Sequence, residues 1–165
     1  MKLRQVIAER VESVCQRMGT ALWQVQGIEQ ILAKYYAIAF KLSGSPSAEE
    51  IEAEFGRNFV HTAGRLVGLI RGARGADDPI AQRLANFVDE RAWLVHKLRL
   101  TDYMALSEEA GFQAVLARIG AIEREAEQLI ELFHNLLIDH FVSLGTPREF
   151  ILEEQAKALR EIYDE

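Results

Sequence analysis

Apolar residues recur in alternating steps of four and three along the first 42 residues of the chain. This spacing keeps them on one side of a helix and is typical of coiled-coil-like packing. The positions are Ile7, Val11, Val14, Met18, Ala21, Val25, Ile28, Leu32, Tyr35, Ala39 and Leu42. A helix of about 36 residues is about 54 Å long at 1.5 Å per residue. The fold must therefore accommodate one long helix that packs along most of its length.

Turn and capping signals divide the next part of the chain. Residues 43–46, Ser-Gly-Ser-Pro, end the first helix and form a turn. Ser47 followed by Glu50 is a capping box, which predicts a second helix from there to about Arg71. A glycine-rich stretch, residues 72–75, ends that helix. Asp77 and Asp78 before Pro79 then open a third helix that fades near residue 103.

A second long helix is predicted from about Ser107. Its apolar spacing again alternates three and four, through Phe112, Val115, Ile119, Ile122, Ala126, Leu129, Phe133, Leu136 and His140. Residues 145–147, Gly-Thr-Pro, end it and allow a fifth helix over residues 147–163. No segment has the pattern of a strand. The sequence predicts one all-α domain over residues 1–165, an antiparallel bundle of about five helices with two long ones.

Composition narrows the class of protein. The 165 residues carry a formal charge of −6, so the chain has no global positive field for nucleic acid or anionic membrane. Cys15 is the only cysteine, which excludes an intrachain disulfide and a cysteine zinc cage. No run approaches the roughly 20 apolar residues of a membrane-spanning helix, and charges in residues 1–12 argue against a signal peptide. We expect a cytoplasmic protein with no membrane contact and no cofactor.

Long helices leave apolar stripes that one small bundle does not fully cover. A second copy commonly buries such a stripe, and a symmetric dimer is the most frequent arrangement. The sequence therefore predicts a homodimer.

Arg91 and His96 are the candidate catalytic residues. On an ideal helix, Arg91 lies within about 60° of the direction set by the apolar stripe of the third helix. A guanidinium there needs a carboxylate, a carbonyl, a subunit boundary or a ligand anion. His96 follows five positions later and points about 140° away. A kink, or a site shared between two copies, would be needed to aim both at one atom.

At these residues the chain resembles the HEPN superfamily, helical domains of higher eukaryotes and prokaryotes. The family motif is an arginine, four to six residues and a histidine on a helix of a compact bundle, and Arg91 to His96 matches its four-residue version. Many members are dimeric, metal-independent RNA endonucleases, frequently toxins of toxin–antitoxin or defence systems. The resemblance implies that His96 acts as general base and acid and that Arg91 stabilises charge on the phosphate. It also implies RNA and an antitoxin protein as partners.

Two positions depart from the family pattern. Ala92 follows the arginine where members often have a polar residue, commonly asparagine. Leu98 stands where a tyrosine is common. These departures bear on catalysis more than on fold. The alternative is a non-catalytic interaction or regulatory module, in which Arg91 makes a buried ion pair, His96 is a boundary histidine, and the protein acts through dimerisation or partner binding.

Other candidate sites are weaker. Arg71, Arg74 and Arg83 cluster around one loop and could form a small patch for RNA or phosphate, although arginines near a turn are commonly just solvated. Glu131 and His134 have the spacing of helical di-iron ligands, but no second such pair occurs, so no metal is expected.

Two further side chains, His140 and Cys15, are expected to serve packing rather than chemistry. His140 is expected to be a hydrogen-bonded core histidine because it continues the apolar spacing. Cys15 is expected to be a buried packing residue beside the stripe. His61 could approach the third helix.

Overall fold

The structure is a computed structural model that describes residues 2–44, 46–59 and 61–163. Most of this part of the chain is helical, and it contains no strand there. Seven α-helices follow one another: α1 (Lys2–Tyr36), α2 (Ala48–Phe59), α3 (Ala63–Arg74), α4 (Pro79–Ala92), α5 (Leu98–Thr101), α6 (Glu109–Ser143) and α7 (Arg148–Tyr163). Shorter turns join them: π-helical η1 (Ala37–Lys41) and η2 (Trp93–Lys97), and 3₁₀-helical η3 (Met104–Ser107). The predicted all-α bundle with two long helices is confirmed.

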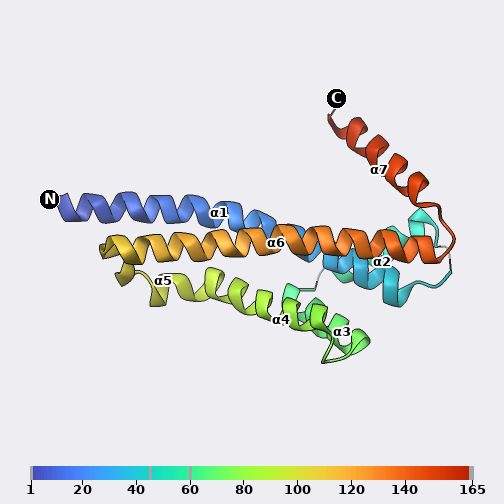
Figure 1. Ribbon diagram of the computed structural model, residues 1–165, viewed down its shortest axis with the longest axis horizontal. Coiled ribbons are helices and arrows are strands. Elements are labelled where there is room, and N and C mark those ends of the chain that lie inside the picture. Colours follow the sequence, from blue (N-terminus) through green and yellow to red (C-terminus); the bar gives the residue numbers. More distant parts are fainter. Residues whose placement is uncertain (1, 45, 60, 164–165) are drawn as a thin grey trace.

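The two long helices α1 and α6 lie side by side and form the spine of the bundle (Figure 1). They run in the same direction, because Arg10 of α1 pairs with Glu109 near the start of α6 and the Tyr35 ring packs on Phe133 farther along. Helix α4 runs in the opposite direction along them, so α4 and α6 are antiparallel neighbours (Figure 1). Helices α2 and α3 cover one end, and α7 projects from it (Figure 1).

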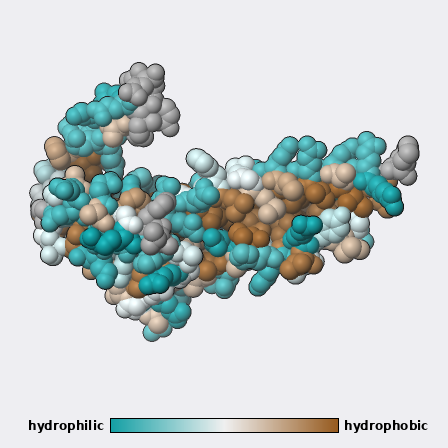
Figure 2. Space-filling model, turned by 180° about the vertical axis from the view of Figure 1, so that it is seen from behind, coloured by the Kyte–Doolittle hydropathy of each residue, from teal (hydrophilic) through white to brown (hydrophobic). Residues whose placement is uncertain are grey.

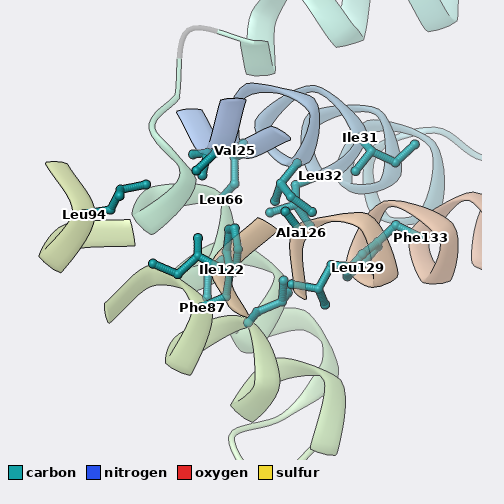
Figure 3. Packing of buried hydrophobic residues seen from close by; sticks show 14 of the residues in the cluster. Val25, Ile31, Leu32, Leu66, Phe87, Leu94, Ile122, Ala126, Leu129 and Phe133 are labelled. Carbon is teal, nitrogen blue, oxygen red and sulfur yellow. The ribbon is translucent and has the colours of Figure 1, made fainter. Parts of the chain in front are cut away.

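The apolar stripes predicted for the two long helices form the core. The buried stripe positions of α1 are Val14, Ala21, Val25, Ile28, Leu32 and Tyr35. Those of α6 are Val115, Ile119, Ile122, Ala126, Leu129 and Phe133. Figure 3 shows Leu66 of α3 and Phe87 of α4 joining these two rows. The pattern of apolar residues thus predicted which faces of α1 and α6 are buried, because a helix repeats its faces every 3.6 residues.

The prediction of one continuous second helix is wrong, because the helix is interrupted between α2 and α3. The break ends at Thr62, whose backbone is extended and whose hydroxyl accepts a hydrogen bond from the Arg65 N–H at 3.4 Å. Before it, the buried Asn58 amide donates to the Glu54 carbonyl at 2.8 Å. A capping threonine begins α3 anew. Ser45, part of the predicted turn before α2, lies outside the described residues.

The third predicted helix is also interrupted. Helix α4 begins as expected, with the Asp78 carboxylate accepting from the N–H groups of Ile80 and Ala81 and with Pro79 in the first turn. After Ala92 the helix widens into the π turn η2, which the spacing of apolar residues did not predict. Such turns add a residue to one turn of a helix and occur often at functional sites.

A tight contact fixes the start of α6. A Cβ at Gly111 would lie 2.3 Å from the Ala105 carbonyl oxygen, so only a glycine lets η3 fold this closely against α6. At the other end of α6, Gly145 has a φ of 98° and its N–H donates to the Val142 carbonyl at 3.0 Å. This left-handed glycine ends the helix and lets α7 leave the bundle.

Candidate functional site

Arg91 lies in the last turn of α4 and pairs with a carboxylate of α1. Its Nη2 is 3.0 Å from Glu29 Oε1, and the two side chains are 27% and 25% exposed. A carboxylate was one of the partners that the position of Arg91 in the apolar stripe required. The Arg91 Nε is buried and has no hydrogen-bond partner in the described structure. The guanidinium is therefore held inside the bundle by the chain itself.

His96 lies on the π turn η2, and its side chain is exposed. The Leu98 N–H donates to the Trp93 carbonyl, five residues back, which adds one residue to this turn. Because the π turn is wider than an α-helical turn, the angle around the helix axis between the side chains of Arg91 and His96 is smaller than in a straight α-helix. Arg91 is nevertheless turned toward α1, whereas His96 faces solvent. Within one chain the two residues do not converge on one point.

Trp93, between the two motif residues, is buried by polar and cationic contacts that the sequence did not reveal. The indole N–H donates to Asp102 Oδ2 at 2.9 Å, and the Arg118 guanidinium lies 3.9 Å from the ring centre. Arg118 also makes two hydrogen bonds to the Glu90 carboxylate, at 2.8 and 2.9 Å. These bonds lower the pKa of Glu90 and raise that of Arg118. The motif segment is thus tied to α6 on this side.

The three arginines predicted to bind phosphate lie in different environments. Arg74 pairs with Asp78 at 3.0 Å and donates to the Tyr35 hydroxyl at 2.8 Å, and the bond to Asp78 raises the Arg74 pKa. Arg83 makes a bidentate pair with Glu125 of α6, at 2.6 and 3.0 Å, which raises the Arg83 pKa. Arg71 is exposed. Two of the three cations are therefore neutralised within the chain.

The remaining histidines show no converging ligand set. Glu131 and His134 are exposed and line an open hollow beside α7, of about 440 Å³. Within the described residues, no three histidine, cysteine or acidic side chains gather as metal ligands would. His140 is half-buried and packs near the Phe141 ring. His61 is half-buried just after the end of α2.

Cys15 is exposed, so the prediction that it is buried is wrong. It lies in a groove of about 750 Å³ between α1 and the η2–α5–η3 segment, which we call the α1–α5 groove. The groove is lined by Arg4, Ile7, Ala8, Val11, Val14, Cys15 and Met18 of α1 and by Leu94, Val95, Leu98, Arg99, Tyr103 and Leu106 of the opposite segment. The spacing of apolar residues had placed Cys15 beside a covered stripe. Helix α6 covers the neighbouring Val14, but the side of α1 that carries Cys15 lines the open groove.

The α1–α5 groove is part of a wider apolar surface. Figure 2 shows hydrophobic side chains gathered in a band along the half of the molecule that carries the N-terminus. Leu3, Leu100 and Met104 in this half are each more than 60% exposed. Sequence reasoning missed the groove, although the α1 stripe continues through Val11 and Ile7 beyond the last buried position, Val14, and was a signal for it.

The chain exposes more surface than a compact protein of its mass. Its accessible surface is 10601 Å², whereas a compact monomer of this mass exposes about 8,300 Å². The excess of about 2,300 Å² comes from the elongated shape and from α7, which projects from the bundle (Figure 1). A standard protein interface buries about 800 Å² on each partner, so the excess is large enough for one or more such contacts.

Compared with known proteins, the chain matches no family model, no curated protein sequence and no solved structure. The likeness to the HEPN superfamily therefore still rests on the Arg91-to-His96 motif and the helical architecture. No helix in the described part of the chain is both long and apolar enough to cross a membrane.

Proposed function

We propose that the protein is a helical interaction module that acts by binding another protein surface at the α1–α5 groove. The observation that carries the proposal is the groove itself. An open apolar channel is flanked by Val95, Tyr103 and other exposed apolar side chains. Monomeric proteins rarely leave a large apolar patch uncovered, and such patches mark interaction sites.

The state of the motif residues also favours binding over catalysis. Arg91 already has a carboxylate partner, Glu29, at 3.0 Å. A phosphate would have to displace that carboxylate before Arg91 could stabilise developing charge. Leu94 and Val95, which lie inside the motif, line the groove instead. The motif segment thus serves as one wall of a binding surface.

Site-specific photo-cross-linking in the producing cell tests this proposal. A photoreactive residue replaces Val95, which is 40% exposed in the groove, and in a control it replaces Val142, which is 41% exposed on α6. We expect discrete cross-linked protein products at position 95 that are absent at position 142. The same products at both positions, or none at position 95, would contradict the proposal.

A second candidate function is a metal-independent endoribonuclease. It is favoured by one observation: His96 is exposed beside Lys97 and close in sequence to Arg99, and neither cation forms an ion pair with the described residues. His96 would then be the general base and acid, and Arg91 would have to leave Glu29 to reach the phosphate. The test is to incubate RNA with the protein in the presence of a chelator. Cleavage must occur and must be lost in His96→Ala but kept in His134→Ala, which removes another exposed histidine.

The predicted homodimer and the predicted antitoxin partner stay proposals of the same kind. Dimerisation would bring two copies of the motif segment into one assembly, and it would cover part of the excess surface. Sedimentation at micromolar concentration tests it. A mass near 18.7 kDa would correspond to the single chain and would contradict the homodimer.

A further inference from the structure

The lining of the α1–α5 groove combines an apolar floor with charged side chains that are all positive. Two arginines, Arg4 on α1 and Arg99 on the opposite wall, are its charged members, and no carboxylate belongs to the lining among the described residues. The chain as a whole has more acidic than basic residues, with a net charge of −6. The groove is therefore locally opposite in charge to the protein that carries it.

The two arginines of the groove are available to a partner. Neither Arg4 nor Arg99 forms an ion pair with any described residue. The next two arginines of α1 differ, because Arg10 and Arg17 each pair with a glutamate of α6 at 2.5 Å. Carboxylates of the chain thus neutralise the cations that face α6 and leave those in the groove free.

The shape of the groove suits a helix. Along α1 it extends from Arg4 to Met18, a distance of about 21 Å at 1.5 Å per residue. Its floor on α1 repeats in steps of three and four, through Ile7, Val11, Val14 and Met18. An amphipathic helix of about four turns matches this length, and its own apolar residues at the same spacing would pack between those of the floor.

A second copy of the chain is a poor occupant of the groove. Pairing groove with groove would offer these arginines no carboxylate partner, because the charged residues in the described lining of each copy are again Arg4 and Arg99. Like charges placed together across an interface are unfavourable and exclude wrong partners. A partner whose apolar residues are flanked by carboxylates satisfies both the floor and the arginines.

We infer that the α1–α5 groove binds an amphipathic helix of another protein that carries acidic residues beside its apolar face. This inference rests on the proposed function and names the chemistry of the partner. Arg4 and Arg99 would pair with the flanking carboxylates, and Val95 and Val11 would contact the apolar face. The arginines then select for charge, while apolar contact supplies most of the binding.

A pair of synthetic peptides tests the inference. The probe is an 18-residue helical peptide with leucines at positions i, i+3 and i+7 and glutamates on both flanks, and its twin has lysines in place of the glutamates. Binding to the full chain is measured by fluorescence anisotropy at low salt. We expect the glutamate peptide to bind about tenfold more tightly than its twin. This ratio is expected when two exposed charge pairs, those made by Arg4 and Arg99, change from attraction to repulsion.

Matched variants show whether the groove is the site. The double variant Arg4→Glu/Arg99→Glu should reverse the preference between the peptides. The control Arg65→Glu/Arg71→Glu should not, because it changes the charge equally at two exposed arginines of α3. Val95→Asp should abolish binding of the glutamate peptide, and Val142→Asp should leave it unchanged.

Several results would overturn the inference. Equal affinity for the two peptides would show that the arginines do not select the partner. Loss of binding in the α3 control would place the peptide elsewhere. A dimer that Val95→Asp converts to a monomer would assign the groove to a second copy. In each of these cases the cross-linking at position 95 could still succeed, so the proposed function would survive while this inference failed.

Discussion

Replacing Gly111 by alanine should destabilise the protein, although alanine is the better helix former. Gly111 lies in the first turn of α6, where the chain folds η3 back onto the helix. An added Cβ would meet the Ala105 carbonyl oxygen at 2.3 Å and the Ala105 Cβ at 2.9 Å. The obstacle includes backbone, so it cannot be relieved by rotating a side chain.

The magnitude follows from two opposing effects. Alanine in place of glycine stabilises a helix interior by about 1 kcal/mol. Overpacking against a fixed neighbour costs about 1–3 kcal/mol, and a contact this short belongs at the upper end. We therefore expect Gly111→Ala to lower the free energy of unfolding by about 1–2 kcal/mol. Because Leu106 of η3 and Tyr103 just before it line the α1–α5 groove, the variant should also weaken ligand binding there.

Gly19 supplies the matched control. It lies in the middle of α1, and a Cβ there would meet nothing within 4 Å. Gly19→Ala should stabilise the protein by about 0.5–1 kcal/mol because only the helix preference acts. Urea unfolding followed by circular dichroism measures both variants. At about 2–4 °C per kcal/mol for a chain of this size, their Tm values should differ by several degrees. Equal stabilisation by both substitutions would refute the close contact between η3 and α6.

Three further outcomes are expected. Arg91→Ala should lower the free energy of unfolding by about 1–2 kcal/mol, because it leaves a half-buried carboxylate unpaired. In urea unfolding, the same substitution should lower the free energy of unfolding by less in a protein that already carries Glu29→Gln. Purely additive effects of the two substitutions would argue against the ion pair. The Arg118 bonds hold the pKa of Glu90 below its ordinary value of 4.5, so the stability that they add is present above pH 4.5 and is lost as the pH falls through the lower pKa of the folded state. Glu90→Gln should therefore weaken the fall in Tm below pH 4.5. An unchanged dependence of Tm on pH would contradict this. Cys15 should react with a maleimide in the folded protein, as mass spectrometry can show, and protection until denaturation would contradict its exposure.

The helices and their buried faces could be largely predicted from the sequence. The stripe of α1 and that of α6 are defined by local spacing, and stripe positions such as Leu32 and Ala126 are fully buried. Short-range capping residues also predicted a helix start correctly, as with Asp78 at the start of α4. These features depend on residues within one or two turns of each other, which a sequence displays directly.

The interruptions of these helices could not be predicted from the local sequence. The π turn after Ala92 and the break before Thr62 occur inside segments whose spacing fits a continuous helix. Burial of Trp93 depends on Asp102 and on Arg118, whose position opposite it is set by the packing of α6. A periodic pattern cannot indicate where tertiary contacts make an extra residue in a turn favourable.

For the candidate site, the sequence determined the chemistry and the tertiary structure decided how it is used. The spacing placed Arg91 in an apolar stripe and so required a partner for its charge. Only the tertiary fold, which brings the end of α4 within reach of α1, supplied Glu29, 62 residues away, and turned His96 to solvent. The α1 stripe likewise specified an apolar surface, but whether it became core or groove depended on where the other helices end. Local periodicity sets which face of a helix is apolar, whereas long-range packing sets what that face meets.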